Sequence, residues 1–291
     1  MVGQTTNISG SFRIDSSFSF FRCLFFSILF NSSHAMTSTA IKRVVVSVAM
    51  EAEAKPFVEH LGLKIDEGFF SSAAPFLAYR GIFNENCHIT VVTSGKDNVH
   101  GTGVDNVGTV PGSLSTFLSL EKMKTEAPDE DLILINAGTC GGFGKAGADI
   151  GDVYITTESL SHDRRIPLGP FAEYGIGKVS SIGTENLKNH LVGSKHGVCT
   201  TGNSLDFHDT DMKIMMDNGA HVKDMEASGI AWSCALHGVP HFGVKVVTDI
   251  VDGDRPAAEE FMENLGKAAE SLQNALPKVI DYVCGKDLSE L

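Results

Sequence analysis

The alternation of short apolar runs with helical stretches constrains the fold of this chain more than any other feature. The run Val44–Ala49 (VVVSVA) is almost continuously β-branched, which is typical of a strand that is buried on both faces. Similar runs follow at Asp131–Asn136 and His241–Thr248. Strands that alternate with helices along a chain predict a parallel sheet with helices on both sides. We therefore expect a single α/β domain with a mixed, mostly parallel central sheet.

The remaining predicted elements follow the same alternation. Further strands are predicted at His88–Thr93, Asp152–Thr157, Gly197–Thr201 and Val222–Met225. Helices are predicted at Ala52–His60, Val107–Leu120 and Glu226–Leu236, with a closing helix inside Ala257–Val283. Residues 121–130 (EKMKTEAPDE) are predicted to form a charged surface connection. In open α/β sheets, ligands bind at the carboxyl ends of the strands, so residues that follow the strands are the first candidates for a site.

Composition limits the partners of the chain. The formal net charge is −13, which argues against nucleic acids and anionic membranes, because both are bound by clustered Lys and Arg. None of the six cysteines forms a Cys-x-x-Cys pair, so neither a zinc site nor a disulfide framework is indicated. We expect buried thiols in a reducing compartment. No metal and no cofactor is expected, and the predicted location is the cytoplasm.

The first 35 residues differ from the rest of the chain because they are rich in Ser and Phe. The run Phe18–Phe30 (FSFFRCLFFSILF) is interrupted by Arg22 and is too short to span a bilayer comfortably. Two interpretations stay open: a signal or transit peptide, which would allow targeting to an organelle, and sequence upstream of a start at Met36. We treat residues 1–40 as an extension that is disordered, serves targeting or lies upstream of the start, and residues 41–291 as the folded domain.

Three acids follow predicted strands. Glu53 follows the first strand, Glu226 follows the short strand near residue 224, and Asp249 ends the last strong strand. Taken singly, each acid could simply stabilise the first turn of a helix. If the three converge, they form a pocket of carboxylates with no nearby base. Such a pocket suits a positively charged transition state, as in glycosidic cleavage through an oxocarbenium-like sugar.

Other motifs are less specific. The segment Ile135–Phe143 (INAGTCGGF) reads as a tight glycine turn or as a place where backbone N–H groups approach a ligand. It lacks the G-x-G-x-x-G pattern, so a dinucleotide site is poorly supported. The segment Ser161–Arg165 (SHDRR) could hold a catalytic His–Asp pair, but a loop with solvated or partner-facing charges is favoured. No G-x-S-x-G elbow is present.

Six motifs in order resemble those of plant-type 5′-methylthioadenosine nucleosidases, which belong to the nucleoside phosphorylase/hydrolase superfamily. They are AMEAEAKP, INAGTCGGF, SHDRRIP, TGNSLDF, KDMEASGIA and VTDIVDGDRP. The resemblance runs from about Arg43 to Leu291 and does not cover residues 1–40. It implies hydrolysis of the N-glycosidic bond of 5′-methylthioadenosine, a purine thionucleoside, in methionine salvage. It also implies a homodimer without a cofactor, and S-adenosylhomocysteine stays open as a second substrate.

The resemblance assigns roles to individual residues. It implies that Glu53 positions the attacking water and that Asp249 protonates purine N7. Glu226 matches the acid that binds the ribose hydroxyls, with Met225 packing on the sugar. Leu205 matches the segment near the adenine, and Thr139 and Gly141 match the ribose side. Ile166, Pro167 and Phe171 are candidates for an apolar slot around the 5′-alkylthio group, supplied by the second subunit.

Three rival functions have different signatures. A phosphorylase of the same fold needs Arg or Lys at the strand ends to bind phosphate, whereas the loop Ser94–Asn98 offers only Lys96. A carboxylate beside the nucleophile would also repel phosphate. A non-catalytic storage-type relative would not need the three acids, and an oxidoreductase would need the missing dinucleotide fingerprint.

Overall fold

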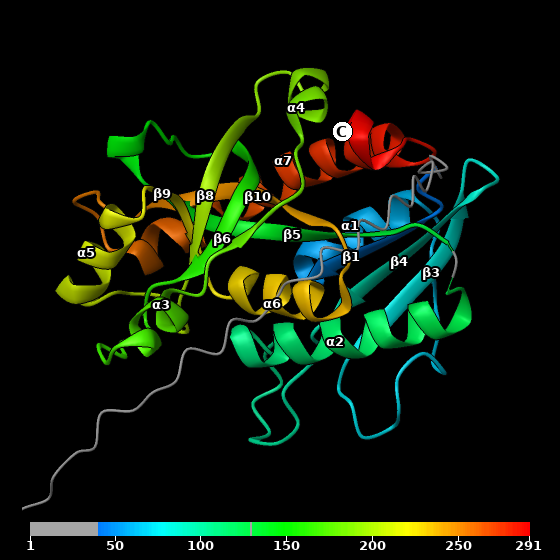
Figure 1. Cartoon of the computed structure of the whole chain (residues 1–291), viewed down its shortest axis with the longest axis horizontal. Coiled ribbons are helices and arrows are strands. Elements are labelled where there is room, and N and C mark those ends of the chain that lie inside the picture. The colour runs from blue at the N-terminus through cyan, green and yellow to red at the C-terminus, as the bar shows by residue number, and fades with distance from the viewer. Residues whose placement is uncertain (1–39, 129) are drawn as a thin grey trace, which may run out of the picture. The chain divides into compact units, whose positions relative to one another are not determined.

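The computed structural model describes residues 40–128 and 130–291 (Figure 1). The predicted extension of residues 1–40 lies outside the described residues except for Ala40, so the interpretations of that segment stay predictions. Among residues 40–128 and 130–291, no helix is long and apolar enough to cross a membrane.

Strands and helices alternate along most of the described chain. The strands are β1 (Arg43–Val48), β2 (Lys64–Ile65), β3 (Leu77–Phe83), β4 (Cys87–Thr93), β5 (Leu132–Gly142), β6 (Val153–Ser161), β7 (Val179–Ser180), β8 (Lys195–Thr201), β9 (Ala220–Asp224) and β10 (His241–Ile250). The α-helices are α1 (Glu51–His60), α2 (Thr109–Glu126), α3 (Pro170–Ile176), α4 (Glu185–His190), α5 (Asp209–Asp217), α6 (Ala227–His237) and α7 (Ala257–Val283), and short 3₁₀ turns lie at Gly144–Ala146 and Leu288–Glu290.

The strands of the described chain form one mixed sheet, in the order β10-β6-β8-β9-β5-β1-β4-β3-β2, with β7 beside β6. β1 lies between β4 and β5 and is parallel to both. β5 also pairs with β10 in parallel, so the path from β10 through β6, β8 and β9 returns to β5 and closes on itself. The carboxyl ends of β1, β5 and β10 consequently point the same way, and the predicted fold class is confirmed.

The sheet is covered on two sides, which explains why its central strands are apolar on both faces. Val44 and Val46 of β1 belong to the core that includes residues of α1 and α7. Val45 points the other way and packs with Leu120 of α2 and Ile230 of α6. Figure 1 shows α7 above the sheet and the neighbouring α2 and α6 below it. Each fully buried aliphatic side chain of this kind contributes roughly 1.5–3 kcal/mol to folding.

Two predicted boundaries are wrong. Residues 121–126, predicted as a surface connection, continue α2 to Glu126, because Leu120 and Met123 keep the buried side of the helix apolar while the charged residues face solvent. The predicted glycine turn after Asn136 is instead the second half of β5. Its glycine backbone pairs with β10 and, at Gly141 and Gly142, with β9.

The cysteines differ from the prediction at one pair. Cys87 at the start of β4 and Cys284 after α7 form a disulfide, although they are 197 residues apart. Only the fold brings them together, so their sequence spacing carries no signal. Cys140, Cys199 and Cys234 are buried free thiols, as expected.

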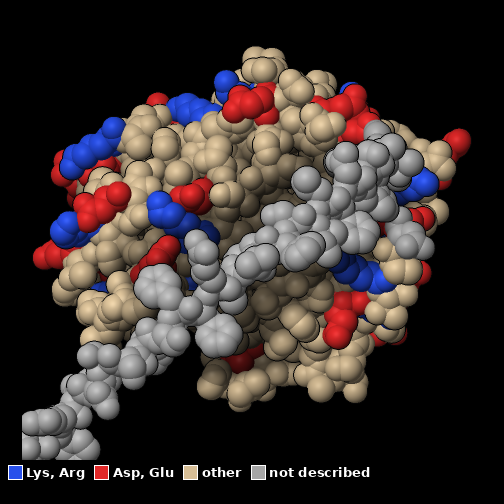
Figure 2. Space-filling model, viewed as in Figure 1, with Lys and Arg blue, Asp and Glu red and all other residues tan. Residues whose placement is uncertain are grey.

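On the face shown in Figure 2, the Lys and Arg that are in view lie among Asp and Glu. Both signs of charge are thus visible on that face, although the formal net charge of the whole sequence is −13.

Candidate active site

A cavity of about 350 Å³ opens at the carboxyl ends of the central strands. β1, β5, β9 and β10 lead into it, and α1, the residue before α6 and the amino-terminal part of α7 contribute side chains to it. Its walls are formed by Ala49, Met50, Glu53, Val107, Asn136, Ala137, Gly138, Thr139, Cys140, Gly141, Leu205, Lys223, Asp224, Met225, Glu226, Lys245, Thr248, Asp249 and Phe261. The three acids singled out in the sequence therefore meet in one place.

Glu53 lies in the first turn of α1 and is only 5% exposed. Its Oε1 accepts hydrogen bonds from the backbone N–H of Thr139 at 2.8 Å and from the Thr139 hydroxyl at 2.7 Å. Burial raises the pKa of Glu53, although the two hydrogen bonds from Thr139 and the charge of Lys245 oppose the increase. Thr139 therefore fixes one carboxylate oxygen and favours the ionised form that a base requires.

Glu226 is the residue that precedes α6, and it lines the cavity. Its Oε1 accepts a hydrogen bond of 2.7 Å from the backbone N–H of Gly108, the residue before α2. Burial and the neighbouring charge of Asp224 raise the pKa of Glu226 to about 7, against the opposing charge of Lys245. Glu226 thus links two helix starts and holds a proton more readily than an exposed glutamate.

Asp249 lies inside β10 and is 5% exposed. The Thr248 hydroxyl donates to Asp249 Oδ1 at 2.7 Å. Burial raises the pKa of Asp249, while that hydrogen bond and the charge of Lys223 counteract it and Glu260 adds to it. A Cβ at Gly141 would lie 2.8 Å from Asp249 Oδ2, so the glycine of β5 provides the space that this carboxylate occupies.

Two buried lysines lie near the acids, so the prediction that the carboxylates have no basic side chain nearby is wrong. Lys245 of β10 pairs with Asp224 of β9 at 2.7 Å, and both side chains are at most 2% exposed. Asp224 also accepts from Thr201 Oγ1 and from the N–H of Ala227 at the start of α6. Lys223 donates to the carbonyls of Ser204 and Leu205. The sequence offered a signal for Lys245, because a lysine inside a strand that is buried on both faces usually has an acidic partner.

The predicted site residues divide into two groups. The cavity is lined by Glu53, Thr139, Gly141, Leu205, Met225, Glu226 and Asp249. Ile166 and Phe171 are not among its lining residues in the single chain, and Phe171 is 58% exposed. Their predicted role at the 5′ end of a ligand therefore depends on a second copy. Sequence reasoning missed Val107, Asn136 and Phe261, whose positions depend on loop paths and on α7.

The SHDRR segment lies outside the cavity, and the interpretation of its charges as solvated or partner-facing stays a prediction. His162 is buried, its Nδ1 lies 2.9 Å from Thr200 Oγ1, and burial lowers its pKa to about 4. Arg165 pairs with Asp211, and Arg164 lies over the ring of Tyr174. Among the described residues, no group of three or more His, Cys, Asp or Glu side chains is arranged to hold a metal ion.

Comparison with known proteins fits this geometry. A sequence model described as the Phosphorylase superfamily matches residues 43–281. The chain belongs to this superfamily. A curated relative, 5′-methylthioadenosine nucleosidase of Arabidopsis thaliana, is 42% identical over 252 residues, which cover 86% of this chain and 91% of the relative. A second protein of the same plant, 5′-methylthioadenosine/S-adenosylhomocysteine nucleosidase, is 40% identical and is covered to 95%.

Solved structures extend the superfamily relationship to three dimensions. The apo structure of Arabidopsis thaliana 5′-methylthioadenosine nucleosidase matches with a TM-score of 0.81 at 41% identity, over 87% of this chain and 100% of that chain. The crystal structure of an MTA/SAH nucleosidase matches with a TM-score of 0.80 at 40% identity. The resemblance to plant-type nucleosidases inferred from the motifs is therefore confirmed.

Proposed function

We propose that this chain hydrolyses the N-glycosidic bond of 5′-methylthioadenosine, releasing adenine and 5-methylthioribose in methionine salvage. The observation that carries the proposal is the convergence of Glu53, Glu226 and Asp249 on one cavity. The similarity to plant nucleosidases at 40–42% identity over 86% of the chain supports the choice of substrate.

The mechanism assigns opposite protonation states to two carboxyl groups. Asp249, whose pKa is raised by burial, holds a proton and donates it to N7, which turns adenine into a better leaving group. Glu53 stays ionised, accepts a proton from the attacking water and stabilises the cationic sugar. The hydrogen bonds from Thr139 favour this ionised form of Glu53. Burial raises the pKa of both carboxyl groups, and the proposal gives the base role to Glu53 because Thr139 donates two hydrogen bonds to its carboxylate. Two acids in different protonation states allow acid and base roles in one site.

Glu226 provides the grip on the sugar in this proposal. Its Oε1 is bound by the Gly108 N–H, so the second oxygen is available to accept hydrogen bonds from the ribose 2′- and 3′-hydroxyls. Met225 beside it lines the same cavity and supplies an apolar contact for the ring. Binding of the sugar hydroxyls next to the ionised Glu53 favours the transition state, in which the sugar carries positive charge.

Water rather than phosphate fits the charges of the cavity. The buried cation Lys245 is neutralised by Asp224, and the two hydrogen bonds of Lys223 go to backbone carbonyls. A phosphate dianion would stand beside the Glu53 carboxylate, which repels it. The described walls of the cavity therefore offer a phosphate no arginine, and the one ammonium that is not paired with a carboxylate, Lys223, already donates to two backbone carbonyls.

The decisive experiment measures adenine release from 5′-methylthioadenosine in phosphate-free buffer and again with added phosphate. We expect equal rates and free 5-methylthioribose in both. Strict phosphate dependence with a sugar phosphate as product would show that the rival phosphorylase is correct, and no release in either buffer would favour the non-catalytic relative. S-adenosylhomocysteine is the second substrate to assay, because one of the relatives is named for both compounds.

We also propose that the chain acts as a homodimer. A hollow of about 200 Å³ joins α2, α3 and α6, and Tyr174 and Trp232 line it. Exposed apolar side chains on the same three helices are Val110, Leu114, Phe171, Tyr174, Trp232 and Leu236. An apolar surface of this kind is typical of a protein interface, and a second copy covering it would carry Phe171 toward a neighbouring site. Sedimentation should give a dimer that Trp232→Glu dissociates with loss of activity, whereas a fully active monomer would contradict the proposal.

A further inference from the structure

The side chain of Lys223 is buried in the cavity wall, and the mechanism proposed above assigns it no role. Lys223 belongs to β9 and is 5% exposed. Its Nζ donates to the carbonyl oxygens of Ser204 and Leu205, each at 2.9 Å. A buried ammonium is costly unless its donors find acceptors, and here the acceptors are the backbone of the segment that carries Leu205 into the cavity.

The segment of residues 202–208 is held at its start by other contacts. The N–H of Gly202 donates to the Asp224 carbonyl, and the N–H of Asn203 donates to Asp163 Oδ2 at 2.7 Å. Its far end joins α5 through the N–H of His208, which donates to Asp211. Between these ends, the backbone of residues 204–207 accepts two hydrogen bonds from Lys223, at the carbonyl oxygens of Ser204 and Leu205. Lys223 therefore holds the backbone in the middle of this segment, which places Leu205 in the cavity wall.

Lys223 also lies near the acid of β10, because Lys223 and Asp249 both pair with Gly141 of β5, from its two sides, and both line the cavity. The charged groups that influence Asp249 are Lys223 from β9 and Glu260 from α7, besides the hydrogen bond from Thr248. Lys223 in turn interacts with Asp249, Asp224, Asp206 and Asp163, while burial opposes its charge. Of these two charged groups, Lys223 is the cation and favours the ionised form of Asp249.

We propose that Lys223 is a positioning residue that fixes the 202–208 segment against the bound purine and places a positive charge beside Asp249. The inference rests on the proposed function, because it assumes that Asp249 is the proton donor. Lys223 thereby keeps the affinity of Asp249 for its proton low enough for transfer to N7. Lys245 plays a different part, since it is already paired with a carboxylate, Asp224.

Three substitutions separate the two effects of Lys223. Lys223→Met removes both the hydrogen bonds and the charge, Lys223→Gln keeps a neutral donor, and Lys223→Arg keeps the charge. The matched control is Lys213→Met on α5, whose side chain is 72% exposed and pairs with Asp217. Steady-state kinetics on 5′-methylthioadenosine between pH 5 and 9 and calorimetric binding of adenine are measured for each, and circular dichroism confirms folding.

The two effects predict different results. For Lys223→Met, KM and the dissociation constant of adenine should rise by about tenfold or more, the scale of a lost charge-assisted hydrogen bond. Because activity needs protonated Asp249, it falls as pH rises through the pKa of that group. Without the cation this pKa increases, so the alkaline limb of kcat/KM should move up by about one pH unit in Lys223→Met and Lys223→Gln. Lys223→Arg should keep the limb of the wild type, and Lys213→Met should change neither quantity.

The proposal fails if folded Lys223→Met or Lys223→Gln keeps both the adenine affinity and the alkaline limb of the wild type. If Lys223→Met does not fold, the comparison of Lys223→Gln with Lys223→Arg gives the same decision. An inactive wild type would overturn the proposed function instead, so the two failures are distinguishable.

Discussion

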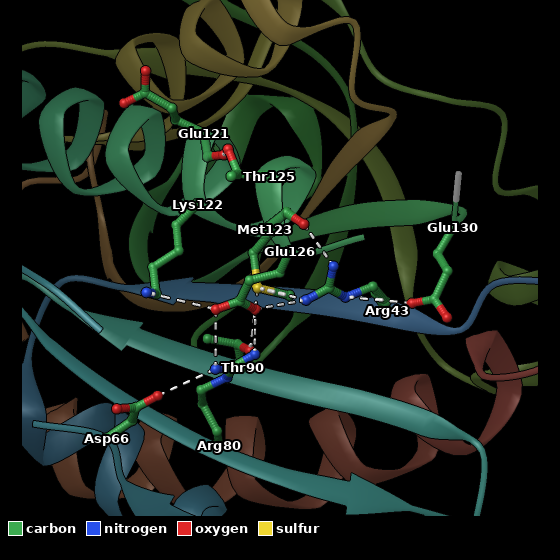
Figure 3. A network of polar contacts seen from close by, with 10 residues as sticks. All are labelled: Arg43, Asp66, Arg80, Thr90, Glu121, Lys122, Met123, Thr125, Glu126 and Glu130. Atoms are coloured by element: carbon green, nitrogen blue, oxygen red, sulfur yellow. Dashed lines mark hydrogen bonds and ion pairs between the residues drawn. The ribbon is translucent and has the colours of Figure 1, made fainter. Parts of the chain in front are cut away.

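The two ends of β1 hold acidic residues in opposite electrostatic states. At its amino end, Arg43 pairs with Glu126 at the end of α2 at 3.0 Å, and Arg80 of β3 pairs with the same carboxylate at 2.7 Å (Figure 3). Burial acts to raise the pKa of Glu126, but the hydrogen bonds from Arg80 and Arg43 and the charges of Arg80 and Lys122 outweigh it, so the pKa is lowered. At the carboxyl end, the pKa values of Glu53 and Glu226 are raised.

The difference is one of saturation. Figure 3 shows arginines on two sides of Glu126, with Asp66 and Glu130 completing the network around them. In the cavity, Glu53 and Glu226 receive backbone and hydroxyl donors, while the buried Lys245 is committed to Asp224. A saturated network stabilises the fold, and an unsaturated one leaves carboxyl groups able to exchange protons or to bind a sugar. The three predicted site acids all belong to the unsaturated end.

The largest expected effect is on catalysis at the unsaturated end. Glu53→Gln and Asp249→Asn should each lower kcat for adenine release by at least ~10²–10⁴-fold, because each removes a general base or a general acid. Both variants should stay folded, since both substitutions keep side-chain size. The measurement is adenine release under single-turnover conditions, and near-normal turnover by either variant would refute the assignment.

The second expected effect is on stability at the saturated end. Arg43→Met removes the buried guanidinium that also donates to the carbonyl of Met123, and the free energy of unfolding should fall by about 2–4 kcal/mol, the usual cost of breaking a largely buried ion pair. Urea unfolding measures the loss. Activity per folded molecule should equal that of the wild type, and a specific loss of kcat would erase the contrast between the two ends.

A smaller effect is expected in the pH dependence of stability. The folded-state pKa of Glu226 is about 7, above that of an unfolded glutamate, so its contribution is complete below the unfolded pKa and is lost as pH rises through about 7. Between pH 5 and 8 the wild type should lose ~1–3 kcal/mol relative to Glu226→Gln, since a pKa unit corresponds to ~1.4 kcal/mol. Parallel pH profiles of urea unfolding for the two proteins would contradict the raised pKa.

The smallest effect sets the scale for an exposed ion pair. Lys213 and Asp217 pair on α5 with both side chains exposed. Lys213→Met should change the free energy of unfolding by no more than ~0.5 kcal/mol, because solvent screens the pair. A loss as large as that of Arg43→Met would show that burial is not what distinguishes the amino end of β1.

Particular residues show how far the sequence led toward the site. The strand ends located Glu53, Glu226 and Asp249 because parallel strands bring their carboxyl ends to one edge. The same reasoning did not find Lys223 and Lys245, since the alternation of strands does not show which side chains of neighbouring strands face each other. It also ended β5 too early, because glycines that pair on both sides of a strand have the local pattern of a turn.

The sequence by itself determined the α/β class, the apolar strands and the edge of the sheet where the acids gather, because these follow from local periodicity and chain order. Tertiary structure alone decided the pairing of Lys245 with Asp224, the hold of Lys223 on residues 204 and 205, and the disulfide between Cys87 and Cys284. These contacts depend on burial and on the register between strands. Both are set when the sheet closes through β5 and β10, and neither is recorded in the spacing of residues along the chain.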